Sequence, residues 1–145
     1  MTRTLLRSRR SERGAALIEA AITVPIILLI SVGIFEFGRA YQTQQVLTNA
    51  AREGARLAVL EGPTDGDVRA RVNNYLTGGG LTSLLDANIQ VNRVVPFTGG
   101  STASQITITY PFTFMVLNPV VRLVAADSKT GEPITMTASA LMRNE

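Results

Sequence analysis

Residues 14–35 constrain the chain more than any other feature of its sequence. They form a stretch of about 22 residues without a basic side chain, long enough for a helix to cross ~30 Å of hydrocarbon. The one charged residue in the stretch is Glu19. An ionisable side chain inside a bilayer costs roughly 2.5–3.5 kcal/mol on insertion scales, so Glu19 needs a partner or a position near the membrane surface. The sequence therefore predicts a single membrane span with one carboxylate to be explained.

The basic residues of the chain gather in front of this span. Five arginines and one glutamate precede Gly14, whereas the rest of the chain is slightly acidic although the whole carries +3. By the positive-inside rule, the N-terminus is expected in the cytoplasm and the head outside. The alternative is a cleavable secretory signal, but its apolar core is shorter and no A-x-A-like site follows Phe35. Because the basic charge lies in a tail, no nucleic-acid partner is expected.

The helical pattern continues without a break over residues 36–61. Apolar and small residues recur on one side at 3.6 residues per turn, so this half of the helix is expected to pack on a head. The expected packing face consists of Phe37, Tyr41, Leu47, Ala51, Gly54, Ala55 and Ala58. The small residues either permit close approach of backbones or simply favour a helix, and the sequence leaves both open. Pro25 removes one backbone hydrogen bond and is expected to kink the helix inside the span.

The remaining residues, 62–145, are expected to form a small α+β head. A second helix is predicted over about 66–77, and the hydrophobic period then changes to 2, which predicts strands over about 88–95, 105–116 and 133–143. Sequential strands usually pair, so a three-stranded antiparallel sheet covered by the long helix is expected. The apolar run at 120–126 either packs under the sheet or contacts a partner or the outer membrane leaflet.

Catalytic chemistry is not expected. The chain has no cysteine and no histidine, which removes the commonest nucleophile–base pairs and zinc sites. The single lysine, Lys129, directly follows Ser128, and adjacent side chains do not face each other across a site. The sequence therefore predicts neither an enzyme nor a metal or other cofactor.

Two motifs in the first sixty residues carry a specific resemblance. RRSERGAALIEAAITV (residues 9–24) resembles a class III prepilin signal, in which a basic leader ends in glycine and a glutamate is the fifth residue of the mature chain. Together with the in-span Pro25, the segments RGAALIE, EFGRA and NAAREGAR resemble the TadE-like family of tight-adherence (Tad/Flp) pilus assembly pseudopilins. TMTASALMR near the C-terminus is similar to that family more loosely.

The resemblance implies a pilin-like fold and a site of processing. Prepilin peptidase would cut between Gly14 and Ala15, removing residues 1–14 and leaving a transmembrane helix over 15–35 in the bacterial inner (cytoplasmic) membrane. The implied partners are other pilins or pseudopilins and the pilus assembly platform, in a homo- or hetero-oligomer. Processed members often have an aromatic residue after the glutamate, where this chain has Ala20.

The expected function is that of a minor pseudopilin in pilus biogenesis and surface adhesion. Cleavage would create an α-amino group at Ala15, with a pKa near 7.7–8.0, that can pair with Glu19 within one chain or between subunits and so fix axial register. The alternative for Glu19 is a carboxylate that reaches the membrane surface. The alternative function is an uncleaved, membrane-anchored scaffold whose head binds an extracytoplasmic partner.

Overall fold

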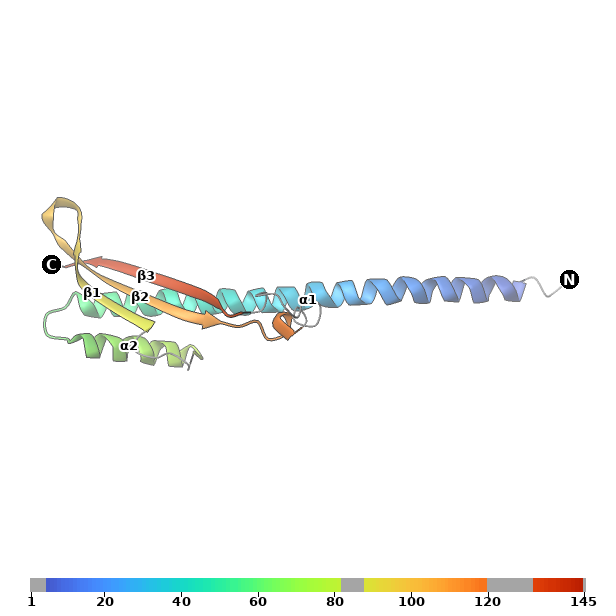
Figure 1. Cartoon of the computed structure of the whole chain (residues 1–145), viewed down its shortest axis with the longest axis horizontal. Coiled ribbons are helices and arrows are strands. Elements are labelled where there is room, and N and C mark those ends of the chain that lie inside the picture. The colour runs from blue at the N-terminus through green and yellow to red at the C-terminus, as the bar shows by residue number, and fades with distance from the viewer. Residues whose placement is uncertain (1–4, 82–87, 120–131, 145) are drawn as a thin grey trace.

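The computed structural model describes residues 5–81, 88–119 and 132–144. Its elements are α1 (Leu5–Ala58), α2 (Asp65–Gly78), β1 (Ile89–Pro96), the short turn η2 (Thr98–Gly100), β2 (Thr102–Phe112) and β3 (Ile134–Arg143). The predicted α+β class, with a long N-terminal helix on a three-stranded antiparallel sheet and one short extra helix, is confirmed. Figure 1 shows an elongated molecule in which the sheet and α2 lie along one half of α1 and the other half projects alone.

Helix α1 dominates the length of the molecule. Its 54 residues correspond to about 80 Å at 1.5 Å per residue. It begins at Leu5 rather than at residue 15 and ends at Ala58 rather than at Glu61. The chain turns after it at Gly62, whose φ of 110° lies in the left-handed region that glycine adopts at little cost.

Helix α2 starts at a strong N-terminal cap. The side-chain oxygen of Thr64 accepts a hydrogen bond from the Asp67 backbone N–H, and the Asp67 carboxylate accepts one from the Thr64 backbone N–H. This capping box satisfies two backbone donors that the helix start would otherwise leave unpaired. The buried residues of α2 are Val68, Val72 and Leu76, spaced so that they share one face.

The strands form a meander in the order β1-β2-β3, with both pairs antiparallel. Ile106, in the middle of β2, lies opposite Val91 and Ala140. Pro111 lies opposite Thr135 of β3 but beyond the end of the β1 ladder, so β2 has a neighbour on one side only at this residue. A proline, which cannot donate a backbone hydrogen bond, is tolerated there.

The bounds of β2 differ from the predicted 105–116 at both ends. The hairpin between β1 and β2 is tight, because Gly99 and Gly100 adopt positive φ, and β2 therefore begins at Thr102. At its other end β2 stops at Phe112, and the following residues leave the sheet to contact α1. Residues 120–126, with their two alternative roles, lie outside the described residues.

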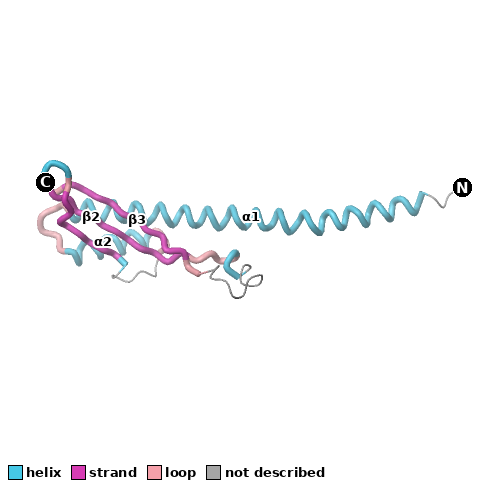
Figure 2. Tube along the Cα trace, turned by 45° about the horizontal axis from the view of Figure 1, so that its top comes forward, coloured by secondary structure: helices cyan, strands magenta, loops and turns pink. Residues whose placement is uncertain are grey.

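Both helices cover the same face of the sheet. The core that they enclose is made of buried apolar side chains from α1, α2 and all three strands: Leu47, Ala50, Ala51, Ala55, Ala58, Val68, Val72, Leu76, Ile89, Ile106, Ile108 and Ala138. The opposite face of the sheet is polar, with hydrogen bonds from Gln105 to Ser139 and between Thr107 and Ser139. Figure 2 shows from another direction that the strands lie along the half of α1 that is far from the N-terminus.

Candidate assembly interface

The projecting half of α1 has the properties of a membrane anchor. Among the described residues it is the one helix that is long and apolar enough to span a bilayer, and none of its most apolar window is buried by the head. Large side chains such as Leu17, Ile22 and Ile30 are more than half exposed. An uncovered apolar surface of this size is not stable in water, so the segment requires lipid or other subunits around it.

The predicted processing residues and Glu19 lie along this exposed segment. Gly14 has open space around it, since an added Cβ would meet nothing within 4 Å. Glu19 is exposed, about 6 Å along the helix axis from Ala15 at 1.5 Å per residue. Both residues therefore lie on the same helix with about one turn between them. The register role of Glu19 and the cleavage of the Gly14–Ala15 bond stay predictions.

Pro25 lies inside α1, which continues on both sides of it as one helix. Six residues further on, the Ser31 hydroxyl donates a hydrogen bond of 2.8 Å to the carbonyl of Ile27. Such bonds back to the preceding turn are common in membrane helices, where no water is available to a hydroxyl. The kink at Pro25 stays a prediction.

Five of the seven residues of the predicted packing face lie where they were expected. Leu47, Ala51, Gly54, Ala55 and Ala58 are buried against α2 and the sheet. Gly54 approaches so closely that an added Cβ would lie 2.5 Å from Cγ2 of Val72. This contact favours close backbone approach, rather than helix propensity alone, as the reason for the small residues.

The other two residues, Phe37 and Tyr41, were wrongly placed on the packing face. Their side chains are 66% and 68% exposed, because they lie at the edge of the stripe and the centre of the buried face runs through Glu36, Ala40 and Leu47 instead. Phe37 contacts the edge of Phe114, with ring centroids 6.0 Å apart.

Glu36 is a buried, paired carboxylate that the sequence patterns did not predict. It is fully buried, and its Oε1 accepts a hydrogen bond of 2.6 Å from the backbone N–H of Val116. Its Oε2 accepts a hydrogen bond of 3.1 Å from Arg39, which also donates to the Thr113 carbonyl. A single carboxylate thus fastens the segment that follows β2 to α1, at the residue directly after the apolar stretch.

The electrostatics of this cluster favour an ionised Glu36. Burial raises its pKa, but the hydrogen bonds from the Val116 backbone and from Arg39 outweigh burial and lower the pKa below its ordinary value of 4.5. The Arg39 guanidinium lies 4.6 Å from the centroid of the Phe112 ring, a cation–π contact that partly replaces lost water. Phe112 in turn packs edge-on against Phe114.

A signal for Glu36 was present in the sequence. Glu36 and Gly54 are separated by about five full turns of a 3.6-residue helix, so they point in the same direction. An acidic residue on the axis of a packing stripe has to be paired. Its partners lie in the segment after β2, however, and no local pattern identifies them.

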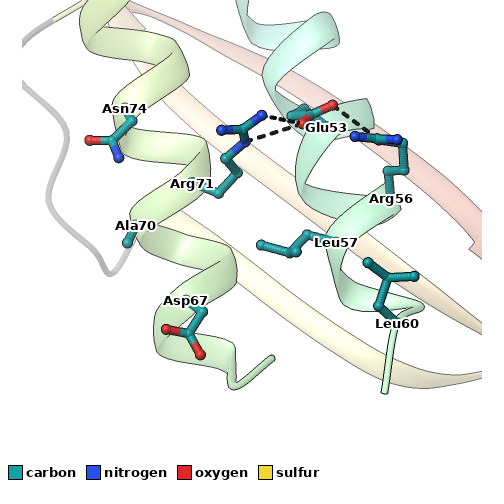
Figure 3. A pocket seen from close by; sticks show the side chains of 8 residues that line it. All are labelled: Glu53, Arg56, Leu57, Leu60, Asp67, Ala70, Arg71 and Asn74. Carbon is teal, nitrogen blue, oxygen red and sulfur yellow. Dashed lines mark hydrogen bonds and ion pairs between the residues drawn. The ribbon is translucent and has the colours of Figure 1, made fainter. Parts of the chain in front are cut away.

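A second feature of the head is an open groove between α1 and α2, of about 460 Å³. Figure 3 shows Leu57 and Leu60 among the side chains that line the groove and Arg71 of α2 reaching across to Glu53 of α1. Two hydrogen bonds, of 3.1 and 2.7 Å, join Arg71 to Glu53 and lower the pKa of that carboxyl, with Arg56 adding attraction at 3.4 Å. No group of three or more acidic residues that could hold a metal ion occurs among the residues that the structure describes.

Comparison with known proteins finds one family match, over part of the chain. Residues 14–56 match the family model described as TadE-like protein, which confirms the resemblance over this segment. The match starts at Gly14 and includes Glu19, Pro25, Glu36 and Gly54, and it ends before α2 and the sheet. No curated protein and no solved structure matches the chain.

Proposed function

We propose that this chain is a minor pseudopilin of a tight-adherence (Flp-type) pilus, a structural component of pilus biogenesis and surface adhesion without catalytic activity. The observation that carries the proposal is the exposed apolar half of α1, which lies inside the TadE-like match and is joined to a packed head. Such a helix is suited to exchange lipid for neighbouring pilin helices, because both surroundings are apolar.

Maturation by prepilin peptidase supplies the partner that Glu19 needs. Cleavage between Gly14 and Ala15 removes the basic leader and leaves an α-amino group about one helical turn from the Glu19 carboxylate. The two groups can pair within one chain or between neighbours. In apolar surroundings an unpaired charge is strongly unfavourable, so only registers that bring acid and amine together are stable.

Mass spectrometry of the protein extracted from membranes tests the processing step. We expect an intact mass that corresponds to a chain beginning at Ala15. A chain that retains Met1 or Thr2 would show instead that the leader is kept.

The Glu19→Gln variant tests the register role. It keeps the size of the side chain but removes its charge, so membrane insertion should be unchanged while pilus assembly falls. Glu61→Gln, which changes an exposed glutamate outside the span, is the matched control and should assemble normally. Piliation at the normal level in Glu19→Gln cells would contradict the role of the acid–amine pair.

The second candidate is an uncleaved scaffold in the same membrane, with a partner-binding head. One observation favours it: α1 runs through Gly14 and Ala15 as part of one helix, whereas proteolysis favours backbone that is not held in such a structure. Cleavage therefore requires local unwinding, to which Gly14 contributes because a helical glycine costs about 1 kcal/mol relative to alanine. The terminal residue found by mass spectrometry decides between the two candidates.

The orientation follows from the charge before the span. With five arginines in front of Gly14, we propose a cytoplasmic N-terminus in the inner membrane and a head on its outer side. Protease added to spheroplasts should digest the head, whereas protease added to inside-out membrane vesicles should leave it intact; the reverse result would invert the topology.

A further inference from the structure

The segment after β2 is held at the level where α1 leaves its apolar stretch. The Val116 N–H donates to Glu36. Glu36 is the first residue after the apolar stretch and lies only about 1.5 Å beyond residue 35 along the helix axis. The Thr113 carbonyl is tied to the same turn of α1 through Arg39. Figure 1 shows this segment alongside α1 on the side of the head nearest to the projecting half.

The surface that this segment exposes is apolar. Residues 113–119 contain no charged side chain, and Met115 and Val116 are 65% and 41% exposed. Phe37 of α1 adds a ring that is 66% exposed and contacts Phe114. We call Phe37, Phe114, Met115, Val116 and Pro119 the junction face.

Among the residues that the structure describes, the charged groups of the head lie mainly towards its other end. The ion pairs Arg71–Glu53 and Arg93–Asp65 lie around the far half of α2 and the end of α1. Close to the junction face, the pair formed by Glu36 and Arg39 is turned inward against Phe112 and the backbone of Val116. The exposed Glu132, two residues before β3, limits how deep this end of the head can enter an apolar phase.

We propose that the junction face rests on the lipid headgroup region of the bilayer that α1 spans. Ile34, three residues before Phe37 and therefore its neighbour on the helix surface, is 70% exposed, so the apolar anchor begins beside the junction face and lipid is the occupant that fits it. Aromatic side chains favour this depth, as in the aromatic belts of membrane proteins, and Tyr41 one turn beyond Phe37 fits the same belt. Glu36 is then a positioning residue that holds the face against the membrane and fixes the tilt of the head.

The absence of tryptophan from the chain makes a direct test possible, because one introduced tryptophan is a unique fluorescent reporter. The full chain is reconstituted in single-copy nanodiscs of phosphatidylcholine brominated either near the headgroup or near the end of the acyl chain. Met115→Trp and Val116→Trp report on the junction face. Ile26→Trp, inside the anchor, and Val94→Trp, 73% exposed on β1, are the controls.

We expect bromine near the headgroup to quench Met115→Trp and Val116→Trp, with weaker quenching from the chain end, while Val94→Trp stays bright. Adding Glu36→Gln to Met115→Trp should reduce the quenching while that of Ile26→Trp is unchanged. Junction-face reporters as bright as Val94→Trp, with Ile26→Trp quenched, would overturn the proposal and leave the face to a protein partner. The outcome depends on the membrane anchor alone and is independent of a role in pili.

Discussion

At the scale of single residues, Gly54 shows how closely the long helix approaches its neighbours. An added Cβ would lie 2.5 Å from Val72 Cγ2 and 3.4 Å from Ile106 Cγ2, and both side chains are fully buried. We predict that Gly54→Ala destabilises the head, because overpacking typically costs about 1–3 kcal/mol and exceeds the gain of about 1 kcal/mol in helix propensity. Thermal unfolding of the full chain in detergent, followed by circular dichroism, measures the effect.

The matched control is Gly38→Ala in the same helix. An added Cβ at Gly38 would meet nothing within 4 Å, so only the propensity gain applies and the unfolding temperature should stay equal or rise. A Gly54→Ala variant as stable as Gly38→Ala would mean that Val72 and Ile106 can move aside without cost.

At the scale of elements, Arg93 of β1 joins the end of α1 to the start of α2. Its guanidinium donates to the carbonyls of Ala58 and Pro63, at 2.9 and 2.7 Å, and to the Asp65 carboxylate at 2.6 Å. These bonds satisfy a carbonyl in the last turn of α1, which has no partner within the helix. A planar fork of donors is needed to reach all three acceptors, and a lysine ammonium cannot replace it.

We therefore predict that Arg93→Lys loosens the turn between the two helices. Hydrogen exchange of the backbone amides of residues 59–65 should become faster. Losing hydrogen bonds to a charged group costs about 1.5–3 kcal/mol, which raises the equilibrium constant for local opening of the turn roughly tenfold or more. Arg71→Lys, which alters a pair that is more than half exposed on its arginine side, is the control and should change exchange little. Equal exchange in the two variants would contradict the joining role of Arg93.

At the scale of the whole molecule, the stability of the head depends on ionised carboxylates. The pKa of Glu36 is lowered although burial opposes it, because the Val116 backbone and Arg39 donate to the carboxylate; the pKa of Glu53 is lowered chiefly by Arg71. Folding thus makes both groups bind protons more weakly than in the unfolded chain, where the ordinary value is 4.5. Their contribution is complete above that pH and is lost as the pH falls through the folded-state values.

The expected pH profile has a plateau and an acid limb. The chain has no histidine, so its unfolding temperature should stay nearly constant between roughly pH 8 and pH 5 and fall below about pH 4.5. Thermal unfolding in detergent over this range measures the profile, and the double variant Glu36→Gln/Glu53→Gln should flatten its acid limb. A wild-type unfolding temperature that rises on acidification would contradict the sign of both shifts.

Local patterns were sufficient to predict the elements, the pairing of the strands and the cover of the sheet by the long helix. The long helix, α2 and three strands each have a hydrophobic period of their own, and the stripe through Leu47, Ala51 and Ala58 identified the face that packs. The prediction that Phe37 and Tyr41 belong to the packing face was wrong, because hydrophobic periodicity shows in which direction the buried face of a helix points but not how many residues on either side of its centre are covered. The end of β2 at Phe112 was also missed, because the residues that follow it alternate as a strand does but are drawn away by Glu36.

The sequence by itself determined the long apolar helix, the α+β head and the TadE-like resemblance, because hydrophobic period, charge distribution and short motifs are properties of neighbouring residues. Only the tertiary structure assigned partners to Glu36 and Arg93. Their hydrogen bonds join segments up to 80 residues apart in the chain, at Val116 for Glu36 and at Ala58 and Pro63 for Arg93. A charged residue on a buried face indicates that a partner is needed. The packing of the whole chain decides which distant backbone group comes within about 3 Å of it.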